Sequence, residues 1–301
     1  MIRKDIIKLF RVPSNKKVRL KDYNPGWNQT PEFEEFGKDA LKERAQQILA
    51  ENLADLAEAQ NLLYADDRYS VLIVLQAMDA AGKDGTIKHV MNGVNPQGCQ
   101  VFSFKKPSSE ELDHNFLWRY MKALPERGRI GIFNRSYYED VLVVKVHPEL
   151  LGRQLPRKKD KIGKKFWERR YEDINTFERH LVRNGTIILK FFLNVSKDEQ
   201  KERFLERLNR PEKNWKFSSA DLAERGYWDD YMEAYEDALS ATSTKWAPWY
   251  VIPADSKWVT RAAVADIVTT AIRDLDLKYP EVTESHKKLL DEARAKLAAE
   301  E

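Results

Sequence analysis

Apolar residues along the chain alternate between short continuous runs and stretches with helical spacing. The continuous runs predict strands at residues 70–76, 100–104, 129–133, 186–193 and 248–254. The helical spacing predicts helices near residues 84–94, 109–123, 136–145, 163–183 and 196–210. Because the strand runs are nearly continuous in apolar residues, they favour a parallel sheet covered by helices on both faces. We therefore expect an α/β protein with three layers, α/β/α, around a central five-stranded parallel sheet.

The two ends of the chain are predicted to be helical extensions of this domain. Residues 34–63 have apolar positions at helical spacing, and residues 283–301 resemble a charged helix without a core of its own. The predicted organisation is an N-terminal extension and helix at 1–65, the α/β domain at 66–275 and a C-terminal helical tail at 276–301.

Composition narrows the class of protein. Hydrophobic residues make up 42% and charged residues 33% of the chain, and no apolar run approaches the roughly 18 residues that a membrane helix needs. The N-terminus lacks the apolar core of a signal peptide. The single cysteine, Cys99, excludes an intramolecular disulfide and fits a reducing compartment. We expect a cytoplasmic protein without zinc, since the histidines lack metal-ligand spacing.

Positive charge is concentrated in two basic runs, although the net charge is only +3. Residues 3–21 contain eight Lys or Arg and one acid, and residues 153–170 contain nine against two acids. Such runs are compatible with solvated surfaces, or with a surface that attracts a polyanion. The runs alone do not distinguish these two interpretations.

The segment QAMDAAGKDGT, residues 76–86, predicts a phosphate-binding loop after the first strand. Its small residues, which let backbone N–H groups converge on an anion, are Ala77, Ala80, Ala81 and Gly82, and Gly85 keeps the following helical turn slim. Lys83 opens the following helix, whose N-terminus adds a favourable dipole. The usual pattern G-x-x-x-x-G-K-[ST] is broken at Ala77 and Asp84. An ordinary strand-to-helix turn is the alternative interpretation.

Two aspartates in this loop indicate a cation. A carboxylate beside a phosphate is repelled unless a metal intervenes, and Mg²⁺ takes one or two carboxylates together with phosphate oxygens. Asp84 also fits the first turn of a helix, where it stabilises the dipole by about 0.3–1 kcal/mol. Asp79 lies too early for that role, so we predict Asp79 as the ligand of Mg²⁺, with Mn²⁺ as an alternative ion.

The segment GRIGIFNRSYYED, residues 128–140, places an arginine at the end of another strand. Ser136 and Glu139 have the S-x-x-E spacing of a capping box, which would account for both residues. Capping does not explain Arg135. At the carboxyl end of a strand beside the loop, its guanidinium could clamp a transferring phosphoryl group, so we predict that Arg135 is catalytic.

Together these segments resemble the polyphosphate kinase 2 family. The resemblance rests on MDAAGKDGTIKHV, GIFNRSYYEDVLVVKVHPE, KNWKFS and APWYVIPAD, and runs from roughly residue 20 to 275. It implies a P-loop kinase-like fold with a helical lid at about 200–240. It also implies Mg²⁺-dependent, reversible transfer of the terminal phosphoryl group of inorganic polyphosphate to a nucleotide, without a protein-bound intermediate. The implied acceptors are AMP and ADP, with guanine nucleotides as an option, and the implied assembly is a homodimer or homotetramer.

The resemblance assigns roles to individual residues. Asp79 would place the metal, Lys83 would contact the donor phosphates, and Arg135 would act on the transferring group. Arg203 would be a catalytic residue of a mobile lid. The remaining polyphosphate-binding residues would be Ala80, Ala81, Gly82, Asp84, Gly85, Lys213 and Lys216. The nucleotide-binding residues would be Lys105, Arg119, Asn134, Arg135, Tyr138 and Glu139.

This chain departs from the family pattern at two of these positions. Many members have Asp-Arg-Ser followed by Asn, where this chain has Asn134, Arg135 and Ser136 followed by Glu139. One expected magnesium carboxylate is therefore missing. The combination resembles the class that accepts both AMP and ADP, which makes Glu139 the candidate for acceptor choice.

The chemistry of phosphoryl transfer agrees with this interpretation, because it requires positioning, a metal and positive charge rather than a protein nucleophile. A basic track should bind polyphosphate through counterion release, and the 153–170 run with Lys213 and Lys216 could line it. The lid aromatics are expected to pack the lid rather than stack on a base. They are Trp215, Trp228, Tyr231 and Tyr235.

Two rival functions make different predictions. An ATP-dependent nucleoside monophosphate kinase predicts an ordinary G-x-x-x-x-G-K-[ST] loop, which this chain lacks. A non-catalytic nucleic-acid-binding protein predicts a recognisable reading module, and the sequence contains neither zinc-finger spacing nor an aromatic RNA-binding signature. We therefore expect neither nucleic acid nor membrane as a partner.

Overall fold

Five parallel strands form the centre of the protein in a computed structural model that describes residues 4–28, 31–154 and 162–300. They are β1 (Ser70–Gln76), β2 (Cys99–Ser103), β3 (Ile130–Asn134), β4 (Thr186–Asn194) and β5 (Trp249–Pro253). Their order across the sheet is β2-β3-β1-β4-β5, and every neighbouring pair is parallel. The predicted five-stranded parallel sheet is confirmed.

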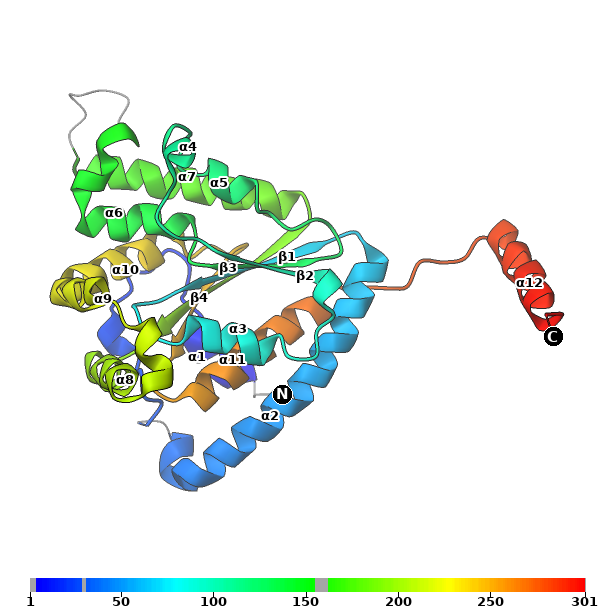
Figure 1. Ribbon diagram of the computed structural model, residues 1–301, viewed down its shortest axis with the longest axis horizontal. Coiled ribbons are helices and arrows are strands. Elements are labelled where there is room, and N and C mark those ends of the chain that lie inside the picture. The colour runs from blue at the N-terminus through cyan, green and yellow to red at the C-terminus, as the bar shows by residue number, and fades with distance from the viewer. Residues whose placement is uncertain (1–3, 29–30, 155–161, 301) are drawn as a thin grey trace.

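Helices cover both faces of this sheet (Figure 1). One face carries α2 (Pro31–Asp66), α3 (Lys83–Val90) and α11 (Lys257–Arg273), and the other carries α6 (Val143–Val146), α7 (Lys164–Arg183) and α10 (Trp228–Thr242). Every residue of β1, β3 and β5 is buried. Strands with two covered faces do not alternate between apolar and polar residues, which is why the sequence indicated three layers.

The sequence pattern did not predict α11, although it packs more extensively on α2 than any other helix pair does. Most of its residues are buried, so its apolar positions lack the one-sided period of a surface helix. A buried hydrogen bond between Asn52 and Asp266, 3.0 Å long, also joins the two helices. Within α2, Gly37 interrupts the helix with φ 74° and ψ 169°.

Two helices predicted as continuous are broken. Residues 109–123 contain only the short helices α4 (Ser109–Leu112) and α5 (Trp118–Met121), because the side chain of Asn115 accepts from the N–H of Leu117 at 3.0 Å. Residues 136–145 form the 3-10 helix η3 (Tyr137–Val141) and the α6 turn.

The capping box predicted at the start of η3 is wrong. Ser136 Oγ accepts from the N–H of Tyr138 at 3.3 Å, and the carboxylate of Glu139 turns towards Gln76 instead of the helix start. A capping box forms at Ser108 and Glu111, ahead of α4. Glu139 therefore has another role, which the site geometry defines.

The predicted lid region is helical. It contains α8 (Lys197–Asn209), η5 (Pro211–Lys216), α9 (Ser219–Glu224), η6 (Arg225–Tyr227) and the start of α10. Trp228, Tyr231 and Tyr235 are buried, as expected for aromatics that pack the lid. Trp215 is 79% exposed, so its predicted packing role is wrong. It lies on η5, none of whose residues is buried.

The N-terminal segment adds a strap beside β5. After α1 (Lys4–Phe10), the N–H of Val12 donates to the carbonyl of Trp249 at 2.9 Å, and Phe10 and Val18 are buried. Three further 3-10 helices are η1 (Leu20–Asp22), η2 (Pro96–Gly98) and η4 (Pro148–Gln154). At the other end, α12 (Glu284–Ala298) buries no residue and stands away from the body (Figure 1). Among the described residues, no helix is long and apolar enough to cross a membrane.

Candidate active site

The loop between β1 and α3 turns through two residues in the left-handed region. Ala80 has φ 61° and Gly82 has φ 108°; glycine adopts such angles readily, whereas alanine is strained there. Gly82 precedes α3 without a side-chain cap, so the first N–H groups of the helix lack intrahelical partners. These groups and the helix dipole form a site for an anion such as phosphate.

A second strained residue completes the site from β3. Arg135 follows this strand with φ 64°, and its N–H donates to the carbonyl of Leu75 in β1 at 3.0 Å. Its guanidinium contacts Asp79 at 2.6 Å and Glu139 at 3.2 Å. The structure therefore brings the two predicted motifs together at the carboxyl ends of adjacent strands.

Glu139 is held on both of its carboxylate oxygens. Gln76 Nε2 donates to Oε1 at 2.8 Å, and Arg135 donates to Oε2 at 3.2 Å. Gln76 is fully buried at the end of β1. Gln76 was not predicted as a site residue, although a glutamine that ends a mostly apolar strand is a usable signal. Glu139 thus orients Arg135 from the side opposite Asp79.

Lys83 bends back over the loop. Its Nζ donates to the carbonyls of Ala77 at 2.8 Å and Met78 at 3.4 Å. Burial, followed by repulsion from Arg135, lowers the pKa of Lys83 to about 8, although Asp79 and other nearby carboxylates act in the opposite direction. With this pKa, the Lys83 ammonium group beside the anion site begins to lose its proton in slightly alkaline solution.

Arg203 supports the loop from α8. Its Nε donates to Glu199 at 2.7 Å, and its NH1 donates to the carbonyls of Ala80 and Ala81 at 3.0 and 2.7 Å. Its NH2 donates to the carbonyls of Ala254 and Asp255, after β5. Because four of these hydrogen bonds end on backbone carbonyls, Arg203 links the phosphate loop to the turn after β5. Its catalytic role stays a prediction.

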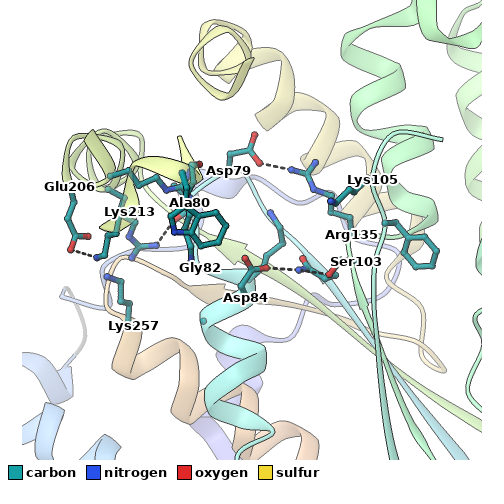
Figure 2. A pocket seen from close by; sticks show the side chains of 18 residues that line it. Asp79, Ala80, Gly82, Asp84, Ser103, Lys105, Arg135, Glu206, Lys213 and Lys257 are labelled. Atoms are coloured by element: carbon teal, nitrogen blue, oxygen red, sulfur yellow. Dashed lines mark hydrogen bonds and ion pairs between the residues drawn. The ribbon is translucent and has the colours of Figure 1, made fainter. Parts of the chain in front are cut away.

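These elements surround a cavity of about 650 Å³, here called the loop cavity (Figure 2). The predicted site residues that line it are Asp79, Ala80, Gly82, Lys83, Asp84, Gly85, Lys105, Asn134, Arg135, Arg203, Lys213 and Lys216. Trp215, predicted to pack the lid, also lines the cavity. Five further lining residues were not predicted from the sequence: Ser103, Phe104, Glu206, Arg207 and Lys257. They come from the end of β2, from α8 and from α11, and no local motif marks them.

The loop cavity is strongly basic. Its lining contains eight Lys and Arg side chains against three carboxylates. Figure 2 shows Ser103, Lys105 and Arg135 on one side of the loop, and Glu206, Lys213 and Lys257 on the other. Lys213 is paired with Glu206 at 2.6 Å. A cavity with this excess of cations suits a ligand with several negative charges.

Several predicted residues do not line this cavity. Ala81 is buried, and Tyr138 is fully buried with its hydroxyl on Glu178, so it has no surface for a nucleotide. Arg119 donates to the carbonyl of Lys105 at 2.8 Å and to Tyr120, which places it behind the lining residue Lys105. Glu139 does not line the cavity itself but contacts Arg135, which does.

The basic run at 153–170 is also absent from the lining of the loop cavity. Part of this run, residues 155–161, lies outside the described residues. Of its described members, Arg170 is buried and donates to Gln154 at 2.9 Å. The described part of the run is therefore not part of a track through this cavity.

Two carboxylates of the loop fit a magnesium ion. The described residues contain no group of three or more His, Cys, Asp or Glu that could hold a metal by themselves, whereas Mg²⁺ needs only one or two carboxylates beside phosphate oxygens and waters. Asp79 and Asp84 both line the loop cavity. Asn134 Nδ2 donates to Asp84 Oδ1 at 2.7 Å. Asn134, which stands where the resemblance leads us to expect an aspartate, therefore orients the carboxylate of Asp84.

Fold and site together define a P-loop kinase-like protein with a modified phosphate loop. The family model for polyphosphate kinase 2 (PPK2) matches residues 39–280. The chain is 51% identical over 290 residues to the ADP-polyphosphate phosphotransferase of Rhodopseudomonas palustris, covering 96% of this chain and 98% of that protein. It is 45% identical over 286 residues to the AMP/ADP-polyphosphate phosphotransferase of Meiothermus ruber, covering 95% and 100%.

A solved structure of similar sequence also matches this chain. The polyphosphate kinase 2 of Arthrobacter aurescens TC1 superposes with a TM-score of 0.82 and is 41% identical, covering 95% of this chain and 96% of that one. The chain therefore belongs to the polyphosphate kinase 2 family.

Proposed function

We propose that this protein transfers the terminal phosphoryl group of inorganic polyphosphate to AMP and ADP. The observation that carries the proposal is the loop cavity, where eight cationic side chains and three carboxylates surround a phosphate loop with Asp84 in the position of the usual hydroxyl. A donor with many phosphates needs such an excess of charge along its length. The names of the similar proteins, which include ADP and AMP/ADP acceptors, support the same substrates.

The arrangement suggests where each substrate binds. The donor chain would lie along the lid side, on Lys213, Lys216 and Lys257, with its terminal phosphate on the loop amides and Lys83. The acceptor would enter beside β2, where Lys105 lines the cavity. Arg119 would reach the acceptor only by leaving the carbonyl of Lys105.

Transfer then requires little covalent chemistry from the protein. An oxygen of the acceptor's terminal phosphate forms a new P–O bond while the bridging P–O bond to the donor chain breaks, and the chain is released one phosphate shorter. Arg135 stabilises the charge on the moving group, and Asp79 and Glu139 fix its guanidinium from two sides. Magnesium, held by Asp79 and Asp84, would neutralise phosphate charge. The same geometry serves the reverse reaction.

Acceptor choice, base choice and assembly belong to this proposal as well. Glu139 would set the ratio of AMP to ADP use through the position of Arg135. We retain guanine nucleotides as additional acceptors, Mn²⁺ as an alternative ion, the cytoplasm as the location and a homodimer or homotetramer as the assembly.

The proposal is tested by incubating the protein with polyphosphate and either AMP or ADP, with Mg²⁺ or with EDTA, and separating the nucleotides by chromatography. We expect ADP and ATP from AMP, and ATP from ADP, only with Mg²⁺. ATP formed from ADP but no product from AMP would restrict the acceptor to ADP. Undiminished turnover in EDTA would show that the reaction does not need the metal.

A further inference from the structure

A second cavity, of about 560 Å³, lies outside the loop cavity and shares none of its lining residues. It is formed by the N-terminal segment around Lys16 and Lys17, by Lys145 of α6, by Lys164 and Tyr171 of α7, and by α10. Its volume is within the range of about 300–1,000 Å³ that small-molecule sites occupy. The proposed phosphoryl transfer makes no use of it.

The walls of this second cavity are fixed parts of the fold. The N–H of Val18 donates to Ser240 Oγ at 2.8 Å, and the N–H of Leu20 donates to Glu236 at 2.7 Å. Ser243 Oγ donates to the carbonyl of Val12 at 2.8 Å. These bonds hold the N-terminal segment along α10, so the lysines that it carries have a defined position beside α7.

The two basic runs of the sequence meet at this cavity. Lys16 and Lys17 belong to the run at 3–21, and Lys164 belongs to the run at 153–170. With Lys145, four lysines face two carboxylates, Glu168 and Asp237, in the lining. Lys145 is ion-paired with Asp237, and Lys164 lies 3.8 Å from Glu168. The charge of Lys16 and Lys17 remains in excess, which favours an anion.

A buried hydroxyl supplies independent evidence for a ligand. Tyr171 is only 6% exposed, lines the cavity, and its hydroxyl has no hydrogen-bond partner among the described residues. Buried polar groups are nearly always paired. Burial and the nearby Asp237 raise the pKa of Tyr171, so the hydroxyl is a donor at physiological pH. A half-buried ring, Trp167, adds an apolar surface beside it.

We propose that this cavity is a second binding site for a phosphoanhydride chain, from inorganic polyphosphate or from the triphosphate of a nucleotide. Lys16, Lys17 and Lys164 contact the phosphate oxygens, and the hydroxyl of Tyr171 donates a hydrogen bond to one of them. The site binds without turnover, and its existence does not depend on the reaction proposed for the loop cavity.

The test is isothermal titration of the full-length protein with tripolyphosphate. Lys16→Ala/Lys17→Ala should lose one binding component or weaken it by about tenfold, because two charged contacts disappear. Lys287→Ala/Lys288→Ala removes the same charge from exposed positions of α12 and should leave the isotherm unchanged. Repeating the titration with Lys83→Ala isolates the second cavity, since that substitution weakens only the loop cavity.

Tyr171→Phe is the second, conservative variant. It should weaken the same component by about tenfold, the effect of one hydrogen bond to a charged group, without lowering the thermal unfolding temperature of the unliganded protein, because the hydroxyl has no partner among the described residues. An unchanged affinity in Tyr171→Phe would contradict the proposed hydrogen bond from the hydroxyl to the ligand. Isotherms that match wild type for both this variant and the lysine pair would overturn the proposal.

ATP and inorganic phosphate distinguish the sources. If Lys16→Ala/Lys17→Ala weakens a binding component of tripolyphosphate but ATP shows no such component, the ligand is polyphosphate. If ATP shows the same component, the site also accepts nucleotides. Inorganic phosphate that binds there as tightly as tripolyphosphate would contradict recognition of a chain. Phosphoryl transfer measured on the same variants reports separately on the loop cavity.

Discussion

Arg135 and Asp79 follow adjacent strands of the sheet, and their side chains form an ion pair of 2.6 Å beside the phosphate loop. The arginine lies in the left-handed region at φ 64° and also binds Glu139. A phosphoryl group that enters the loop cavity therefore meets a guanidinium already fixed by two carboxylates. Preorganised positive charge of this kind is a large contribution to phosphoryl transfer.

Glu139 is expected to control acceptor choice through Arg135. Glu139→Asn shortens the side chain and removes the charged partner, so Arg135 gains freedom and the AMP-to-ADP ratio of kcat/KM should change by about tenfold, the value of a hydrogen bond to a charged group. The measurement is initial rates with each acceptor at saturating polyphosphate. Glu126→Asn, at a surface pair with Arg129, is the matched control. Equal loss with both acceptors would make Glu139 a positioning residue without a role in selection.

The activity should fall in alkaline solution because of Lys83. Its pKa is lowered to about 8, so the free enzyme carries this charge below about pH 8 and loses it as the pH rises further. We expect kcat/KM for polyphosphate to fall by up to about tenfold per pH unit above that point. Bound phosphates stabilise the charged form, which moves the decline of kcat to higher pH.

Lys83→Arg provides the control for this pH profile. Arginine stays charged at all accessible pH values, so the variant should show a lower but flat kcat/KM between about pH 7 and 10. A wild-type profile that is equally flat over this range would show that titration of Lys83 does not limit donor binding.

The sheet could be predicted from the sequence because its strands are largely apolar runs that alternate with helical patterns. The helix α11 was not predicted, because burial on nearly all of its sides removes the helical period. Glu139 was predicted as part of a helix cap from a local S-x-x-E pattern, but its carboxylate binds the buried Gln76 and Arg135 instead. Local spacing could not predict these partners, because they lie on other elements.

The same limit applies to the lining of the site. Asp79, Lys83 and Arg135 belong to motifs next to strand ends, and the structure brings all three to one cavity. Arg207 and Lys257 come from helices of ordinary charged composition, so only the three-dimensional arrangement reveals them. The basic run at 153–170 was expected at the loop cavity, whereas its member Lys164 lines the second cavity.

Two glycines of the loop should respond to alanine in opposite ways. Gly82 has φ 108°, which alanine adopts only with strain, so Gly82→Ala should lower the free energy of unfolding by about 1–3 kcal/mol. Gly85 lies in the first turn of α3, and a Cβ there would meet nothing within 4 Å. Gly85→Ala should therefore raise it by about 0.5–1 kcal/mol. Urea unfolding measures both changes, and an unchanged or raised free energy of unfolding in Gly82→Ala would refute the strain at Gly82.

A buried ion pair behind the site should be sensitive to single substitutions. Lys190 donates to Glu178 at 2.6 Å, and both side chains are fully buried. Tyr137 and Tyr138 of η3, the helix that follows Arg135, also donate to Glu178. Lys190→Met leaves a buried carboxylate without its cation and should cost about 3–5 kcal/mol of unfolding free energy.

The double variant Lys190→Met/Glu178→Gln separates charge from packing at this position. It removes the uncompensated charge, so most of the lost unfolding free energy should return. A double variant as unstable as Lys190→Met would mean that packing around the lysine, rather than the buried charge, causes the loss.

The central claim is that the modified loop binds a polyphosphate donor, and the most direct measurement compares donors. AMP is supplied with Mg²⁺ and either polyphosphate or ATP as the only donor, for wild type and for Lys83→Ala, and ADP formation is followed. We predict rapid formation from polyphosphate, a loss of at least about a hundredfold in Lys83→Ala, and little formation from ATP. Conversion with ATP but not with polyphosphate would contradict the account and identify a nucleoside monophosphate kinase instead.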